Sequence, residues 1–159
     1  MVSIVQTLFP KQITNTFPGQ KIALYVFIPL TLMLIVRSCI LFVAPDGGAQ
    51  SIATIPLDTY SDSAAMNIVA IFSQWGLSQL LLAGLFLLVL VRYRSLISLF
   101  YLLFVLEQIG RISVGLAKPI ATLETAPGAA GNLPLLAIAF VMLVLSLIPS
   151  HSAKEHTDA

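Results

Sequence analysis

Four long apolar stretches dominate this sequence, and each approaches the length that a helix needs to cross a lipid bilayer. They cover residues 22–44, 64–91, 95–117 and 133–148. A membrane-spanning helix requires about 20 mostly apolar residues. Only 9% of the residues are charged, against roughly a quarter in ordinary soluble domains, so lipid is the solvent that suits this surface. The sequence therefore predicts an all-α bundle of four transmembrane helices over residues 22–148.

Polar and helix-breaking residues separate the stretches. The first ends at the Pro-Asp-Gly-Gly of residues 45–48, which is a strong turn signal. Residues 61–63, Ser-Asp-Ser, can cap the first turn of the second helix. Only residues 92–94 separate the second and third stretches, which predicts a tight antiparallel hairpin as the closest-packed unit. A short surface helix is expected around residues 50–55. The fourth stretch is the shortest, so we expect it to rely on neighbouring helices.

The distribution of Lys and Arg predicts the orientation of the bundle. Five basic residues fall on one side, and only Lys118 falls on the other. The five are Lys11, Lys21, Arg92, Arg94 and Lys154. Because cytoplasmic loops carry the excess of basic residues, both termini are expected in the cytoplasm. Residues 1–21 then form a cytoplasmic or interfacial segment, either lying on the membrane surface or loosely ordered, and residues 149–159 form a polar tail.

The composition excludes several kinds of site. A net charge of +1 without clustered basic residues argues against nucleic acid as a partner. Cys39 is the single cysteine, so neither an intramolecular disulfide nor a cysteine-based metal site is possible. His151 and His156 both lie in the polar tail, which leaves no imidazole to ligate a metal or haem within the membrane. We therefore expect neither a metal site nor a cofactor.

Three ionisable residues interrupt the apolar stretches: Arg37 in the first, and Glu107 and Arg111 in the third. A charge at mid-bilayer costs at least about 2.5–3.5 kcal/mol, so such residues usually face the bundle interior and have partners. Glu107 and Arg111 share one helical face because they are four residues apart. At a rise of about 1.5 Å per residue, Arg37 reaches a similar depth. Gln74 and Ser78 of the second stretch fall at the depth of Glu107.

Further polar or aromatic residues extend this layer: Ser38, Trp75, Gln79 and Gln108. In the expected hairpin, the face of the second span that bears Gln74 and Ser78 meets the charged face of the third. The candidate ligand-binding residues are Arg37, Gln74, Ser78, Glu107, Gln108 and Arg111.

Two interpretations of this layer remain open. In the first, the polar groups only hold the helices together, and the arginines pair with Glu107 or extend toward the headgroups. Gly76, Gly84, Gly110 and Gly115 would then permit close helix contacts. In the second, an anion neutralises the formal excess of one positive charge. That anion is Asp46 or Asp62 of the first loop, or a bound lipid phosphate or carboxylate, which the arginine fork matches; a pocket walled by Trp75 and Phe104 would hold such a ligand.

These observations favour a non-enzymatic function. We expect the chain to bind an amphipathic anionic ligand, or to act as an accessory subunit in a membrane-protein complex or homo-oligomer. The alternative is an enzyme acting on a lipid or isoprenoid, with Glu107 as acid or base. Its available second participants are Ser38, Cys39, Gln74 and Ser78, and none stands in a recognised nucleophilic arrangement. A small oligomeric transporter is a further alternative.

Three features resemble a known group of proteins. Arg37 in the first span is followed by a Pro-Asp-Gly break, the turn at residues 92–94 is rich in arginine, and residues 107–111 read Glu-Gln-Ile-Gly-Arg. Over residues 22–148 the chain thereby resembles the DoxX-like families of small four-helix bacterial membrane proteins. The resemblance implies a four-helix architecture in the bacterial inner membrane, and it implies no activity and no functional residue.

Overall fold

The computed structural model describes residues 4–150 of the 159-residue chain. The helices are α1 (Ile4–Leu8), α2 (Lys21–Val43), α3 (Asp62–Arg92), α4 (Ile97–Ala117) and α5 (Pro127–Leu147), with the short 3-10 helices η1 (Leu57–Thr59) and η2 (Arg94–Leu96). Within residues 4–150 there is no strand. The four long helices are each long and apolar enough to cross a membrane. The predicted all-α, four-helix class is confirmed.

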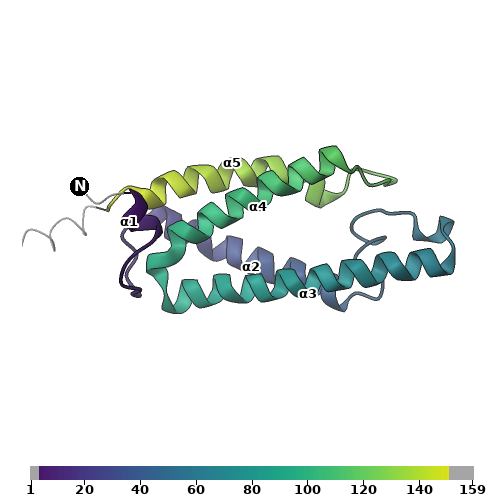
Figure 1. Ribbon diagram of the computed structural model, residues 1–159, viewed down its shortest axis with the longest axis horizontal. Helices are drawn as coiled ribbons and strands as arrows, with labels where there is room; N and C mark the ends of the chain where they lie inside the picture. The colour runs from purple at the N-terminus through teal and green to yellow at the C-terminus, as the bar shows by residue number, and fades with distance from the viewer. Residues whose placement is uncertain (1–3, 151–159) are drawn as a thin grey trace, which may run out of the picture.

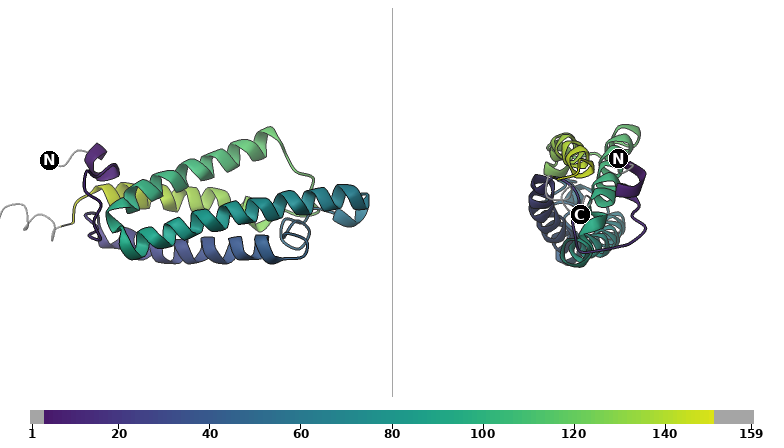
Figure 2. Two further views of the ribbon diagram at one scale, coloured as in Figure 1. Left: turned by 60° about the horizontal axis from the view of Figure 1, so that its bottom comes forward. Right: turned by 90° about the vertical axis from the view of Figure 1, so that its left-hand side faces the viewer.

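The long helices lie in two pairs, α2 along α3 and α4 along α5, and α5 also contacts α2 (Figure 1). From the turn at η2, α4 diverges from α3 toward the other end of the bundle, as Figure 2 shows from a second side. The prediction that the second and third spans form the tightest unit is therefore wrong. A three-residue connection holds two helix ends together, but it does not hold the helices together along their length.

An aromatic core joins α2, α3 and α4 toward the η2 end of the bundle. The ring of Phe27 stacks on Phe86 with centroids 5.4 Å apart, and it meets the ring of Tyr101 edge-on at 5.3 Å. Tyr101 Oη donates a hydrogen bond of 2.7 Å to the Ala23 carbonyl oxygen. This satisfies a buried hydroxyl, and it fixes α4 against α2 about two to four turns below the predicted polar layer.

The fourth span begins six residues earlier than predicted, because α5 starts at Pro127 and continues through Pro134. Pro127 occupies the first turn, where a missing N–H costs no hydrogen bond. Pro134 removes only the bond to the Ala130 carbonyl, and the helix continues beyond it. With 21 residues, α5 is about 31 Å long, so the expected dependence of a short span on its neighbours does not apply.

The N-terminal segment packs against the η2 end of the bundle, beside the end of α5 (Figure 1). Ser150 N donates to the Pro18 carbonyl oxygen at 3.0 Å, and Gln20 Nε2 donates to the Pro149 carbonyl oxygen at 2.9 Å. Thr14 N donates to Ser95 Oγ at 3.0 Å. Residues 4–20 are thus an ordered part of the bundle rather than a loose tail. Lys154 and both histidines lie outside the described residues.

Before η1, the loop between α2 and α3 consists of turns and irregular backbone, so the helix expected around residues 50–55 does not form. Gly47 and Gly48 adopt φ values of 60° and 73°, which suit glycine and end helical structure. Beyond them Ala49, Ile55 and Leu57 are buried in a small second core on the first half of α3. The expected cap is present at Ser61, whose Oγ accepts from Ala64 N at 3.4 Å.

The two loops at this end of the bundle are joined through Thr54. Its carbonyl oxygen accepts from Leu123 N at 2.9 Å, and its hydroxyl donates to the Glu124 carbonyl oxygen at 2.8 Å. The loop after α2 and the loop before α5 therefore form one cap over the end of the bundle nearest the polar layer.

Candidate functional site

Arg37, Glu107 and Arg111 are brought together as one cluster. Glu107 Oε1 lies 4.0 Å from Arg37 Nη2 and 3.8 Å from Arg111 Nη1. Both separations exceed the roughly 2.7–3.2 Å of an N–H···O hydrogen bond. The three side chains are only 19–24% exposed. The cluster is therefore a largely enclosed group with a formal charge of +1, in which the carboxylate attracts both arginines without a hydrogen bond to either.

Residues from α3 and α5 complete the cluster. Arg37 Nη2 donates to Gln79 Oε1 at 2.9 Å, and Arg111 Nε donates to Asn132 Oδ1 at 3.3 Å. The guanidinium carbons of the two arginines lie 5.9 and 5.2 Å from the ring centroid of Trp75, within the range of a cation–π interaction. We call these six residues, Arg37, Trp75, Gln79, Glu107, Arg111 and Asn132, the charged cluster; all four long helices contribute to it.

The charged cluster lies well inside the helical part of the bundle. Arg37 precedes the last residue of α2, Val43, by six positions, and Arg111 precedes Ala117 of α4 by six. At about 1.5 Å per residue, both lie about 9 Å from those helix ends. If the helices span a bilayer, the arginines lie below its surface, where water does not replace missing partners.

Four polar atoms at this level are buried without a hydrogen-bond partner. They are Arg37 Nε, Glu107 Oε1, Gln108 Oε1 and Arg111 Nη1. Each such atom costs about 1–3 kcal/mol when it stays unsatisfied, and native proteins hold few of them. Two of the four, Glu107 Oε1 and Arg111 Nη1, face each other at 3.8 Å, beyond hydrogen-bond distance.

The predicted residues Gln74 and Ser78 are exposed, and neither joins the charged cluster. Ser78 Oγ donates to the Gln74 carbonyl oxygen at 3.1 Å, which satisfies it within its own helix. The neighbouring pair Trp75 and Gln79 faces the arginines instead. Successive residues of a helix point in directions about 100° apart. The prediction that Gln74 and Ser78 meet Glu107 and Arg111 is therefore wrong by one position along α3. Gln108 is buried, with 1% exposure.

The loop aspartates do not neutralise the cluster. The Asp46 carboxylate accepts hydrogen bonds from the backbone N–H groups of Gly48, Gln50 and Ser51 at 2.9, 3.1 and 2.6 Å. Desolvation pushes the Asp46 pKa up, but these bonds outweigh it and hold the pKa below its usual value. Within residues 4–150, Glu107 is the only carboxylate within salt-bridge distance of Arg37 or Arg111.

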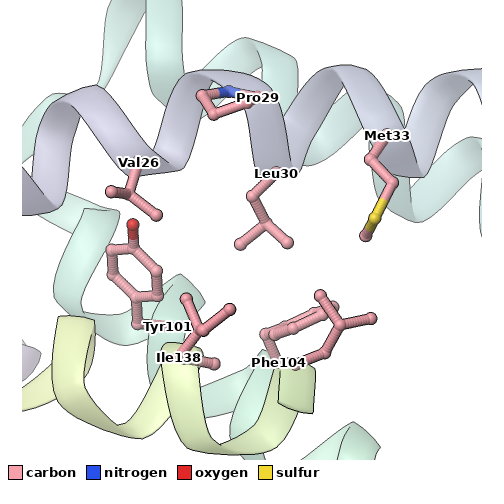
Figure 3. A pocket seen from close by; sticks show the side chains of 9 residues that line it. Val26, Pro29, Leu30, Met33, Tyr101, Phe104 and Ile138 are labelled. Atoms are coloured by element: carbon pink, nitrogen blue, oxygen red, sulfur yellow. The ribbon is translucent and has the colours of Figure 1, made fainter. Parts of the chain in front are cut away.

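An apolar cavity of about 330 Å³ lies between α2, α4 and α5 (Figure 3). Its lining includes Val26, Leu30, Met33, Tyr101, Phe104 and Ile138. Phe104 therefore lines a cavity, as expected, whereas Trp75 packs against the arginines. Met33 and Phe104 lie at one end of the cavity, with Val26 and Tyr101 at the other, as Figure 3 shows.

Asn132 is the cluster member that the sequence analysis missed, because it fell before the predicted start of the fourth span. A polar amide about one turn after a proline that can start a helix, Pro127, is the feature of the sequence that could have indicated Asn132.

Across residues 4–150, no group of three His, Cys, Asp or Glu side chains is placed to hold a metal ion. No protein-family model, curated protein or solved structure matches this chain, so the resemblance to DoxX-like families stays a prediction.

Proposed function

We propose that this chain is a multi-pass membrane protein that binds an amphipathic, lipid-like anion, with the anionic group between Arg37 and Arg111. One observation carries the proposal. Two arginines share a single carboxylate at 3.8–4.0 Å, and Arg37 Nε and Arg111 Nη1 remain buried without partners. An anion that accepts from these N–H groups would neutralise the excess charge and satisfy both atoms.

The neighbours of the arginines suit this role. Gln79 and Asn132 each hold one guanidinium group by a hydrogen bond, and Trp75 lies against both. An arginine whose geometry is already fixed loses less conformational entropy when it binds a phosphate or carboxylate. In this proposal Glu107 keeps the two like charges close together until the ligand arrives.

The distribution of Lys and Arg supports a location for the site. If both termini are cytoplasmic, the charged cluster lies in the outer half of the bilayer, about 9 Å from the helix ends. That depth suits a ligand that stays in the membrane and lowers its headgroup below the surface, in preference to a fully water-soluble anion.

Binding is favoured over catalysis by the positions of the hydroxyl groups. Ser38 Oγ donates to the Leu34 carbonyl oxygen at 2.6 Å, and Ser78 Oγ donates to the Gln74 carbonyl oxygen. Both bonds lie within one helix, so neither hydroxyl is directed to Glu107 as a nucleophile requires. Glu107 has no described partner with which to act as acid or base.

The test is lipid retention by matched variants. The purified protein and its Arg37→Leu, Arg111→Leu and Arg92→Leu variants would be analysed by native mass spectrometry in a mild detergent. We expect the wild type and Arg92→Leu to retain an anionic lipid and both cluster variants to lose it. Arg92 is an exposed residue at the far end of α3, so its variant controls for the loss of one positive charge.

Two results contradict the proposal. Equal retention by all four proteins would show that the lipid binds elsewhere. A wild type that carries no anionic lipid, but copurifies in fixed stoichiometry with another membrane protein, would favour the accessory-subunit alternative.

A further inference from the structure

The apolar cavity and the charged cluster are consecutive along three helices. On α2, Arg37 follows Met33 of the cavity lining by four residues. On α4, Glu107 and Gln108 follow Phe104 by three and four residues. Residues three or four apart are neighbours on one helix face. The Met33–Phe104 end of the cavity therefore lies about one helical turn from the charged cluster.

The same relation holds on α5, which runs in the opposite direction. Asn132, the partner of Arg111, precedes Leu135 of the cavity lining by three residues. Each of the three helices that line the cavity thus places a polar residue one turn beyond it. An elongated molecule with one polar end and one apolar end fits this sequence of surfaces.

Gln108 lies at the junction. It follows Phe104 on the same face of α4 and is 1% exposed, and its Oε1 accepts no hydrogen bond within residues 4–150. A carboxamide offers both donors and an acceptor. Burying one with an unsatisfied oxygen is unfavourable. The position is suited to a hydroxyl group, which can donate to this oxygen, between the anionic end and the apolar chain of a ligand.

We propose that the ligand is an anionic glycerolipid. Its phosphate would lie between Arg37 and Arg111, a free glycerol hydroxyl would donate to Gln108 Oε1, and one acyl chain would enter the cavity between α2, α4 and α5. The inference rests on the proposed function and adds the chemical class of the ligand. A polyprenyl phosphate shares the phosphate and the chain, but it has no oxygen between its first carbons to contact Gln108.

The cavity accommodates one chain. About 330 Å³ is near the lower limit of ligand pockets, which span roughly 300–1,000 Å³. The exposed lining residue Ile138 places one side of the cavity at the bundle surface, where the single acyl chain can enter from the bilayer. A chain that moves from bilayer to cavity exchanges one apolar surrounding for another. The chain therefore sets position and selectivity, and the phosphate and Gln108 supply most of the affinity.

The experiment compares two probes on one set of proteins. Lysophosphatidic acid, which keeps one free glycerol hydroxyl, and a polyprenyl phosphate would each be titrated into delipidated protein in detergent, with bound fractions read by native mass spectrometry. We expect lysophosphatidic acid to bind at least about tenfold more tightly to the wild type. Gln108→Leu should reduce that preference to about twofold and leave polyprenyl phosphate binding unchanged. Gln108→Leu should not lower the melting temperature, because it removes an unsatisfied buried amide.

A second variant tests the chain site without altering the polar residues. Ile138→Phe adds volume at the mouth of the cavity and should weaken binding of lysophosphatidic acid at least fivefold. Val141→Phe, at a similarly exposed position of α5 outside the cavity lining, is the matched control and should not.

The outcomes separate the two proposals. If Arg37→Leu and Arg111→Leu abolish binding of both probes, but the wild type binds both equally and Gln108→Leu and Ile138→Phe change nothing, the glycerolipid inference fails and the anion site stands. If the arginine variants also bind both probes normally, both proposals fail.

Discussion

Gly76 of α3 lies directly against the backbone of Leu41 of α2. A Cβ atom at Gly76 would stand 2.7 Å from the Leu41 carbonyl carbon and 2.8 Å from Phe42 N, closer than atoms in contact can approach. This close contact lies one residue from Trp75 and three from Gln79 along α3. It therefore determines how closely α3 brings Trp75 and Gln79 to Arg37.

A methyl group at this position should separate the helices. We expect Gly76→Ala to destabilise the protein by about 1–3 kcal/mol, the usual range for overpacking. Gly84→Ala on the same helix is the control, because a Cβ there meets no atom within 4 Å. It should stabilise by about 0.5–1 kcal/mol, since alanine favours helix over glycine. Thermal unfolding of the two variants in detergent measures the difference, and a similar shift for both would contradict the close contact.

Removing the carboxylate should leave two enclosed cations facing each other. Removing one partner of a fully buried ion pair costs about 3–5 kcal/mol. Because these side chains are about one-fifth exposed and 3.8–4.0 Å apart, we expect about 1–3 kcal/mol for Glu107→Gln. The double variant Arg37→Leu/Glu107→Leu restores the charge of the cluster to +1 and should recover much of the loss. Unfolding midpoints of the single and double variants test this, and additive losses would argue against coupling.

Reporter fusions test the orientation. A reporter after Ala159, or one inserted between Arg92 and Arg94, should give a cytoplasmic signal, because basic residues concentrate at that end. One placed at Gln50 or Gly128 should give an external signal. A cytoplasmic signal at Gln50 would reverse the orientation and place the charged cluster in the inner half of the membrane.

Lowering the pH should weaken the hydrogen bonds between the Asp46 carboxylate and the loop after α2, so that this loop opens more often. The folded structure lowers the pKa of Asp46 through three backbone N–H groups. The stabilisation is therefore complete above the unfolded pKa of 3.8 and is lost as the pH falls through the lower folded value. Hydrogen exchange at Gly48, Gln50 and Ser51, corrected for the intrinsic rate, should rise in that acidic window. Asp46→Asn should show faster exchange already at neutral pH, and exchange that matches the wild type would refute the role of the carboxylate.

Sequence patterning predicted the number of spans and the ends of α2, α3 and α4 to within two residues. Apolar length and charged breaks are direct signals of a bilayer-spanning helix. The same patterning predicted that Arg37, Glu107 and Arg111 lie at a similar depth in the membrane, because depth follows from counting residues along helices of known rise.

The pairing of helices and their rotation could not be obtained in this way. A membrane helix is apolar on its lipid face and on its packed face, so hydropathy does not distinguish Gln74 from Trp75 as the residue facing the arginines. Of the four glycines expected to mediate close contacts, only Gly76 does, while a Cβ at Gly84, Gly110 or Gly115 meets no atom within 4 Å. The predicted fourth span begins at residue 133, so it leaves out Asn132, which lies within α5.

The hydrogen bonds between the N-terminal segment and the end of α5 place a limit on the order of assembly. Gln20 Nε2 donates to the carbonyl oxygens of Ile148 and Pro149, and the Pro18 carbonyl oxygen accepts from Ser150 N. Pro18 and Gln20 leave the ribosome well before these partners. They can therefore reach their final positions only after α5 has been synthesised.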